Sequence, residues 1–311
     1  MKNDRLNNQP RIQNVLSMKT SLRCSSLLAL TLALAQPGDT RILTSRSTHD
    51  FRSVEPCSLL PIPETALHHY QAGAPNIRVR ESRGRQGEAS RFSSSQNWSG
   101  YAVETSLTSP QKHAVTSVAG RWTIPTVTAS TSAETFSSIW VGIDGYSDGT
   151  VEQLGTEQDW TSSGQQNYVW FEMYPHGAFE IVGFPIAPND EFGAAVTYIG
   201  SSTFVLSITN FTQGVYYRVP TRYTKSRTAQ RSSAEWVLEA PYSGEILPLA
   251  DFGTVTMTGC KATLNNHTGA IGDSSWQNDA ITMVTSDGAT KARPSVLSPD
   301  GTSFSETWNH E

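Results

Sequence analysis

The sequence predicts an all-β protein built as a many-stranded sandwich of antiparallel sheets. Charged residues make up only 16% of the 311 residues, and glycine, serine and threonine are abundant, a composition that disfavours long helices. From residue 96 onward, short segments rich in aromatic and β-branched residues are separated by turn-forming residues, which is typical of strands. No alternation of strand and helix patterns is visible, so a doubly wound parallel sheet is not expected.

The predicted strands are bounded by glycine, proline, asparagine, aspartate or serine, the residues that favour turns. Within a strand, residues two apart share a face, so each segment can turn one face to a core. The region that carries them is large for an immunoglobulin-type domain and suits a sandwich with one concave face. The predicted strands are residues 99–105, 117–124, 137–143, 168–174, 191–199, 203–209, 214–220, 234–240 and 252–257.

The first 35 residues are predicted to be a secretory signal peptide. Five basic residues precede the apolar run of residues 25–35, which ends in Ala-Leu-Ala before Gln36 and Pro37. The run is too short to cross a bilayer, so we expect secretion and no membrane association after signal removal. Met18 is an alternative initiator, because it opens a signal of ordinary length. A buried helix is the competing interpretation of the apolar run.

Residues 36–93 are predicted to be a propeptide, followed by a catalytic domain at residues 94–311. The propeptide is rich in Arg, Pro, Ser and His and lacks sustained periodicity, which predicts a mobile or clipped segment. The first 95 residues hold 13 basic and 7 acidic residues, whereas the rest hold 10 basic and 21 acidic ones, a net charge of −11. These opposite charges predict an inhibitory leader that acid releases; the alternative is a disordered tail without a partner.

The motifs of several enzyme classes are missing. There is no HExxH, P-loop, GxGxxG or GxSxG sequence. Residues 272–276, Gly-Asp-Ser-Ser-Trp, only faintly resemble a serine-peptidase motif. The catalytic region contains one cysteine, Cys260, and four scattered histidines, so neither an internal disulfide nor a Cys/His zinc site is expected there. Its acidic charge argues against nucleic-acid binding. We expect no metal and no cofactor.

Carboxylates that alternate with aromatic residues on predicted strands are the remaining chemical signal. Glu235 and Glu239 share a face of residues 234–240, and Glu172 shares a face with Trp170 and Tyr174. Polar groups ringed by aromatic side chains on one sheet face suggest a binding cleft rather than a core. For any single glutamate, a solvated strand face is the alternative.

Six segments, in this order along the chain, resemble those of the glutamic peptidases, or eqolisins. They are NWSGY (97–101), WVGIDG (140–145), VEQLG (151–155), WFEMYP (170–175), AEWVLE (234–239) and PLADFGTVTMTGC (248–260). The resemblance runs from about residue 95 to about residue 285. It implies a concanavalin-like sandwich of two antiparallel sheets, secretion as a preproprotein, and cofactor-free cleavage of polypeptides at acid pH.

The same resemblance implies roles for individual residues. Gln153 and Glu239 match the catalytic glutamine and glutamate of the family. The residues that would line or brace the cleft are Trp98, Trp140, Asp144, Glu172 and Tyr174. The chain departs from the family in lacking disulfides and in carrying Tyr168 where an acidic residue is common. The spacing after Gln153 is longer, so Glu157 and Asp159 are left without a role.

The implied pair can carry out peptide hydrolysis without a metal. Glu239 would act as the general base that deprotonates water and then returns the proton to the leaving amine. Gln153 would donate a neutral amide N–H to the developing oxyanion. Two alternatives use the same aromatic cleft: a glycoside hydrolase with the carboxylates Glu172 and Glu239, and a lectin-like carbohydrate binder. We expect a monomer whose partners are polypeptide substrates and its own propeptide.

Overall fold

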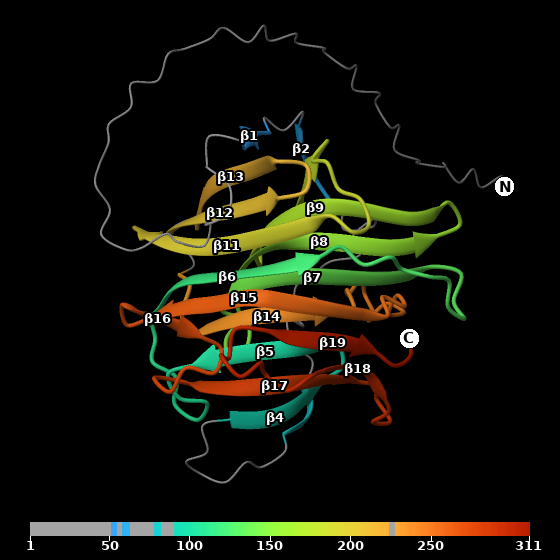
Figure 1. The fold of residues 1–311 in the computed structure, drawn as a ribbon. Coiled ribbons are helices and arrows are strands. Elements are labelled where there is room, and N and C mark those ends of the chain that lie inside the picture. The colour runs from blue at the N-terminus through green and yellow to red at the C-terminus, as the bar shows by residue number, and fades with distance from the viewer. Residues whose placement is uncertain (1–50, 55–57, 63–77, 82–89, 224–227) are drawn as a thin grey trace, which may run out of the picture. The chain divides into compact units, whose positions relative to one another are not determined.

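The computed structural model describes residues 51–54, 58–62, 78–81, 90–223 and 228–311, all within the compact unit Ile42–Glu311. The predicted signal peptide and most of the predicted propeptide lie outside the described residues. Within them, all 19 regular elements are β-strands (Figure 1). The all-β prediction is therefore confirmed. No helix in the described ranges is long and apolar enough to cross a membrane.

One sheet runs through the upper part of Figure 1 and continues to β16. Its neighbours pair antiparallel except β1 and β13, which are parallel. Seven strands form it, in the spatial order β1 (Arg52–Ser53), β13 (Val215–Arg222), β12 (Thr203–Asn210), β11 (Glu191–Gly200), β6 (Val115–Thr123), β15 (Thr254–Leu264) and β16 (His267–Ala270).

The second sheet carries most of the motifs that resemble the glutamic peptidases. Its strands follow the order β2 (Ser58–Pro61), β10 (Phe179–Val182), β9 (Gly164–Tyr174), β8 (Val151–Thr161), β7 (Thr135–Ile143), β14 (Ser233–Glu239), β5 (Trp98–Glu104), β17 (Gln277–Val284), β4 (Ser90–Ser95) and β3 (Arg78–Glu81). Two further strands, β18 (Thr290–Pro294) and β19 (Phe304–Trp308), connect β17 to the first half of β15. Strand β15 thus belongs to both sheets.

Strand β4 differs from the predicted sandwich in its parallel pairing and in its position across the predicted domain boundary. Strand β4 pairs in parallel with β17, with Ser90 opposite Asn278 and Ser95 opposite Met283. The predicted boundary between residues 93 and 94 falls inside this strand. Its composition, SRFSSS, offers little alternation, which is why the sequence pattern did not identify it. The chain ahead of residue 96 therefore contributes strands to the second sheet.

The second sheet is buried on both faces. Trp236, Ile139 and Val141 point into a core cluster that they share with residues of the first sheet, such as Trp122 and Phe192. The intervening residues point to the opposite face, where a second cluster forms. This cluster, named the cleft cluster here, contains Trp98, Ala102, Trp140, Tyr146, Val151, Trp170, Tyr174, Val237 and Ile281. The cluster lies on one face of one sheet, and its members are buried.

Strand β8 was not among the predicted strands. Its sequence, VEQLGTEQDWT, is dominated by polar residues and shows no apolar alternation, yet its first nine residues are all buried. It lies between β7 and β9 in the middle of the sheet. The burial of its polar side chains, rather than their hydrophobicity, marks it as part of a functional site.

Candidate active site

Glu239 lies at the end of β14 and is the acceptor for three N–H donors. Its Oε1 accepts hydrogen bonds from Asn97 Nδ2 (3.2 Å) and Trp98 Nε1 (3.1 Å). Its Oε2 accepts one from Trp140 Nε1 (2.8 Å). Burial raises the pKa of Glu239 to about 8, and the three hydrogen bonds act in the opposite direction. Because all three groups are donors, they favour the ionised carboxylate once water reaches it.

Asn97 owes its position to a residue of β4. Ser95 Oγ donates to Asn97 Oδ1 (3.0 Å) and accepts a hydrogen bond from the backbone N–H of Trp98 (3.1 Å). The Asn97 amide is thereby turned so that its Nδ2 faces Glu239. Neither Asn97 nor Ser95 was among the predicted site residues. The available signal was the position of Asn97 at the start of the NWSGY segment.

Gln153 lies on β8 directly opposite Glu172 on β9. Its Nε2 donates to Glu172 Oε2 at 2.7 Å, while its Oε1 has no hydrogen-bond partner among the described residues. Burial raises the pKa of Glu172, the hydrogen bond from Gln153 lowers it, and the charge of Glu239 raises it again. The charge of Glu239 thus acts on Glu172, which is hydrogen-bonded to Gln153.

The indole of Trp140 lies between the rows of side chains that contain Gln153 and Glu239. Two glycines make room for it. A Cβ at Gly142 would lie 2.9 Å from Trp140 Cζ3, and a Cβ at Gly155 would lie 2.6 Å from Trp140 Cβ. Since real Cβ atoms do not approach so closely, larger residues at either position would displace the ring. The ring and its donor to Glu239 are thus fixed by the backbone of β7 and β8.

Glu157 is a third carboxyl on this face. In the register of the sheet, Glu239 is opposite Ser138, and Ser138 is opposite Glu157. Burial raises the pKa of Glu157 most, and the charges of Asp159 and Glu239 raise it further. Burial also raises the pKa of Asp159, to about 7. Glu157 and Asp159 had no predicted role, because the spacing after Gln153 is longer than in the family.

Asp144 and Tyr174 were predicted to line or brace the cleft, and both are buried. Asp144 follows β7 with a positive φ of 70° and accepts the backbone N–H groups of Arg231 (2.7 Å) and Ser232 (2.7 Å). It makes no hydrogen bond with Gln153 or Glu239 among the described residues. The ring of Tyr174 packs in the cleft cluster, while its backbone carbonyl accepts the hydroxyl of Tyr223 at 2.6 Å.

Glu235 shares the strand face of Glu239 but has different neighbours. It is fully buried, and after burial the groups that raise its pKa are Asp144, Asp148 and Glu104. Neither Glu172 nor Glu239 is among them. In the register of the sheet, Glu235 lies across Gly142 from Gln153, whereas Glu239 lies across Ser138 from Glu157. Glu239 is nevertheless the one of the two whose charge acts on Glu172, the hydrogen-bond partner of Gln153.

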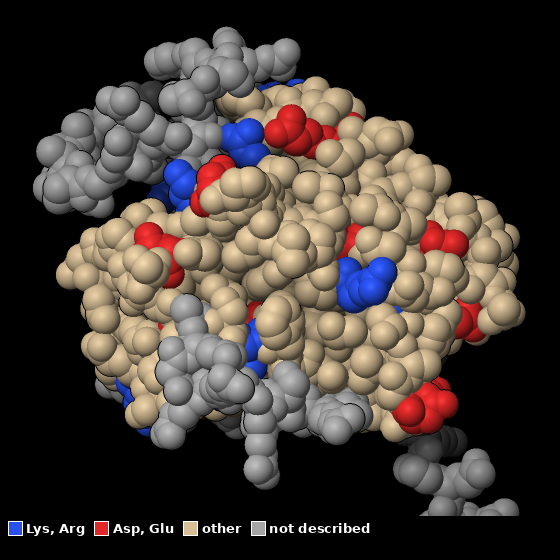
Figure 2. Space-filling model, turned by 60° about the horizontal axis from the view of Figure 1, so that its bottom comes forward, with Lys and Arg blue, Asp and Glu red and all other residues tan. Residues whose placement is uncertain are grey.

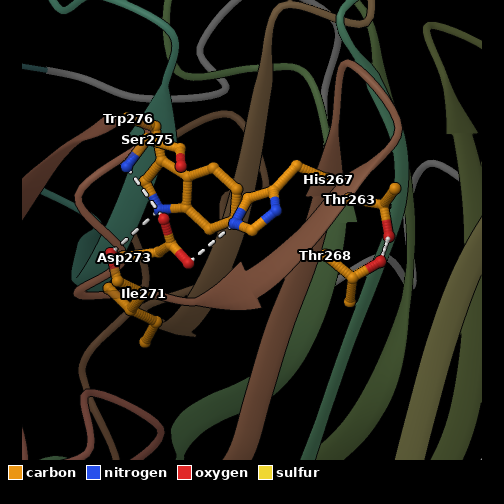
Figure 3. Close-up of polar contacts among 7 residues, drawn as sticks. All are labelled: Thr263, His267, Thr268, Ile271, Asp273, Ser275 and Trp276. Atoms are coloured by element: carbon orange, nitrogen blue, oxygen red, sulfur yellow. Dashed lines mark hydrogen bonds and ion pairs between the residues drawn. The ribbon is translucent and has the colours of Figure 1, made fainter.

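The Gly-Asp-Ser-Ser-Trp segment forms a turn rather than a serine-nucleophile site. His267 Nε2 lies 2.9 Å from Asp273 Oδ2, and the backbone N–H of Ser275 donates to Asp273 Oδ1 at 2.8 Å. Figure 3 shows the imidazole facing this carboxylate, beside the indole of Trp276. In the part of the chain shown there, no serine hydroxyl bonds the imidazole. The segment is stabilised by a local His–Asp pair.

Most of the carboxylates in the catalytic region are not on its surface. Among residues 96–311, eleven of the 21 acidic residues are buried. The described residues of this region that are not buried include ten acids and seven bases. Figure 2 shows one face on which charged side chains are few and scattered. No group of three or more His, Cys, Asp or Glu side chains in the described ranges is arranged to hold a metal ion.

Comparisons with known proteins agree with this architecture. The profile of the peptidase A4 family matches residues 96–303, about two thirds of the chain. Aspergillopepsin-2 from Aspergillus niger is 29% identical over 203 residues, which cover 58% of this chain and 70% of the relative.

Two solved structures share the fold. A scytalido-glutamic peptidase bound to a transition state analog inhibitor superposes with a TM-score of 0.57 at 22% identity, covering 69% of this chain and 98% of its own. The aspergilloglutamic peptidase from Aspergillus niger gives a TM-score of 0.51 at 25% identity, covering 56% of this chain and 99% of its own.

Proposed function

Because this chain belongs to the peptidase A4 family, and is therefore a glutamic endopeptidase acting on polypeptides, we propose that Glu239 and Gln153 form its catalytic dyad. The observation that carries the proposal is the triple hydrogen bonding of the Glu239 carboxylate by Asn97, Trp98 and Trp140. Such a donor set supports an anion at that position. The carbohydrate-directed alternatives gain no support, since the family match is to peptidases.

In the proposed mechanism, Glu239 removes a proton from the attacking water and Gln153 assists the carbonyl. As the water oxygen bonds to the peptide carbon, negative charge develops on the carbonyl oxygen. The second N–H of Gln153 is available to it, since the first is held by Glu172. Glu239 then returns the proton to the leaving nitrogen, which completes cleavage. The proton count requires no metal and no covalent intermediate.

We propose that the enzyme works in acid. A carboxylate base suits acid because histidine is protonated there and cannot accept a proton. In the closed cleft, burial keeps the Glu239 carboxyl neutral over the acid range. Entry of water removes part of that burial, so the pKa of Glu239 falls and the three donors hold its ionised form.

The experiment that tests Glu239 as the base is Trp140→Phe. Removing the Nε1 donor takes away a contact that lowers the pKa of Glu239, so this pKa should rise. The acid limb of the kcat/KM profile reports the ionisation of a base in the free enzyme. It should move to higher pH by on the order of one unit. A pH series of kcat/KM on one peptide measures the shift.

Trp170→Phe is the matched control for this test. Trp170 is also a member of the cleft cluster, but its Nε1 donates to Ser138 Oγ at 3.1 Å rather than to Glu239. The acid limb of the kcat/KM profile of Trp170→Phe should lie at the same pH as that of the parent enzyme. An unmoved limb in Trp140→Phe, or equal shifts in both variants, would assign the base to another residue.

We also propose that the enzyme is secreted, on the signal-like pattern of residues 1–35, and that contacts of its leader with the second sheet inhibit it. Outside the interior, the described residues of the catalytic region include ten acids and seven bases, so their electrostatic attraction for the basic leader should be weak. Strand pairing binds this part of the chain to the second sheet. Strand β2 extends the sheet at β10, and the backbone N–H of Ile62 donates to Ala178 O at 3.1 Å. Ile62 also packs against the cleft cluster. These contacts support a leader seated beside the aromatic cleft.

Ile62→Asp should therefore raise the activity of the purified precursor at pH 7 by at least about tenfold, since it removes an apolar contact with the cleft cluster. Leu59→Asp is the control, because Leu59 on β2 is exposed and its replacement should have little effect. Peptide cleavage, with mass spectrometry of the chain held at pH 7 and pH 4, measures both. Identical activity of the parent and Ile62→Asp precursors would remove Ile62 from the inhibitory contact.

A further inference from the structure

Lys291 stands apart from the other buried charged residues. It is 7% exposed, and every other buried charged side chain of the described residues is a carboxylic acid. Its ammonium forms no ion pair or hydrogen bond with any of these acids or with other described groups. A buried charge is costly unless it is paired. A ligand can provide that partner.

A bulge in the sheet determines where Lys291 lies. Met283 of β17 pairs with Ala292 of β18, but the next residue, Val284, pairs with Thr290. Lys291 is the extra residue between them. Its backbone carbonyl is anchored by the N–H of Asn309 at 2.8 Å. Bulges re-aim a side chain that would otherwise alternate with its neighbours, and they are common at functional sites.

The re-aimed lysine lines a cavity whose other lining residues include neighbours in sequence of Asn97 and Glu239. The cavity has a volume of about 420 Å³, which suits an amino-acid side chain and its backbone. It is lined by Gln96, Tyr242, Ile246, Val284, Thr285, Ser286 and Lys291. Gln96 directly precedes Asn97, and Tyr242 is three residues beyond Glu239. The backbone N–H of Ala240 donates to Asn97 O at 2.8 Å, so the two segments are held together.

The acidic groups near Lys291 are already engaged. Burial lowers the pKa of Lys291, and the charge of Glu311 partly restores it. The Glu311 carboxylate, however, accepts hydrogen bonds from Thr131 Oγ1 (2.5 Å) and Ser132 Oγ (2.6 Å). Asp287, in the turn after β17, accepts the hydroxyl of Thr285. Among the residues that line the cavity, Lys291 is the one with a charged side chain, and lysine stays charged throughout the acid range.

We infer that this cavity is a specificity subsite that binds an aspartate or glutamate side chain of the polypeptide substrate, with Lys291 as its cation. The apolar walls of Ile246 and Val284 would pack on the methylene groups. The Lys291 ammonium would receive the carboxylate, with the Gln96 amide within the same cavity. The inference rests on the proposed role of Glu239 for the closeness of this subsite to the scissile bond.

The test begins with a cleavage profile of a mixed peptide library, read by mass spectrometry at pH 4.5. The parent enzyme should show enrichment of Asp and Glu at one position relative to the cut. Two peptides that differ only by Glu or Gln at that position then give a ratio of kcat/KM. We expect a ratio on the order of tenfold in favour of Glu, falling close to one in Lys291→Met and partly kept in Lys291→Arg.

The pH dependence gives a second readout. The preference for Glu should grow from pH 3 to pH 5.5, because the substrate carboxyl ionises over this range while Lys291 does not titrate. Lys261→Met, which alters an exposed lysine on β15, should keep the full preference. Retained folding of Lys291→Met is checked by its circular dichroism spectrum and its melting temperature.

The outcomes separate this inference from the proposed function. If neither peptide is cut by the parent enzyme, the proposed activity fails. If both are cut equally, or if Lys291→Met keeps the preference for Glu, the subsite is overturned while the dyad stands. Loss of cleavage of both peptides in Lys291→Met together with normal cleavage by Lys291→Arg would still identify a required cation in the cavity.

Discussion

Glu239→Gln is expected to reduce kcat by at least about 10³-fold while leaving the fold intact. Glutamine keeps the size of the side chain but cannot take a proton from water. Its carbonyl oxygen can still accept from some of the N–H groups of Asn97, Trp98 and Trp140 that surround Glu239. The measurement is single-turnover cleavage of a peptide by the purified, leader-free protein, with circular dichroism to follow the fold.

Glu306→Gln is the matched control for this loss. Glu306 is also fully buried, its pKa is also raised by burial to about 8, and it accepts the hydroxyl of Ser99 at 2.5 Å. It takes no part in the proposed site, so its variant should keep its turnover. If Glu239→Gln retained a substantial share of the parent rate, the base would be another residue, and Glu235, which lies across Gly142 from Gln153 in the sheet, would be the first to examine.

The second large effect concerns stability, which should be greatest in acid and fall as the pH approaches 8. Burial raises the pKa of Glu152, Glu172 and Glu235, as it does for Glu239 and Glu306. A carboxyl with a raised pKa binds its proton more tightly in the folded than in the unfolded chain. Between about pH 4.3, where unfolded glutamate titrates, and the folded pKa, the folded state holds more protons, so its stability declines with pH.

The size of this decline is large compared with ordinary stabilities. A single carboxyl whose pKa rises from about 4.5 to about 8 lowers the free energy of unfolding by roughly 4 kcal/mol at pH 8. Native domains have only about 5–15 kcal/mol in total. Two or three such groups therefore suffice to bring the protein close to unfolding at neutral pH, although coupled groups do not add fully.

Thermal unfolding of the leader-free Glu239→Gln protein between pH 3 and pH 8 measures this effect without self-digestion. The melting temperature should fall by more than about 15 °C from pH 4 to pH 8. Adding Glu306→Gln should flatten the curve, because it removes one titrating group. A melting temperature that is constant across this range would contradict the buried-carboxyl account. Hydrogen bonds lower the pKa of the partly exposed Asp273 and of the exposed Asp300, so their contribution to stability is lost only in strong acid.

The sequence predicted the fold class well because alternation is strongest where one face of a strand meets the core. Strands β11 and β12 alternate in this way, and both were predicted. Strand β8 was missed because nearly all of its residues are buried, on both faces, and many are polar. Hydrophobic patterning cannot identify a strand whose buried face is made of Glu and Gln.

The site residues that lie in the family's motifs could be predicted from the sequence. The residues that hydrogen-bond to them from distant strands could not. Gln153 and Glu239 follow from the motifs, and their placement on one sheet face agrees with that assignment. The hydrogen bond from Asn97 to Glu239, and the hold of Ser95 on Asn97, depend on how β4 and β5 meet β14. Lys291 depends on a one-residue bulge between β17 and β18, which no local pattern reveals.

The parallel pairing of β4 with β17 has a practical consequence for producing the peptidase domain on its own. A recombinant chain begun at Gln96, where the family similarity starts, would leave the edge of β17 unpaired and prone to intermolecular strand addition. It would also lack Ser95, whose hydroxyl orients Asn97 toward Glu239, and Ser93, which bonds the buried Asp279 at 2.6 Å. Vectors for this protein should therefore place affinity tags and protease sites ahead of Ser90, so that the purified protein keeps the strand that completes its sheet.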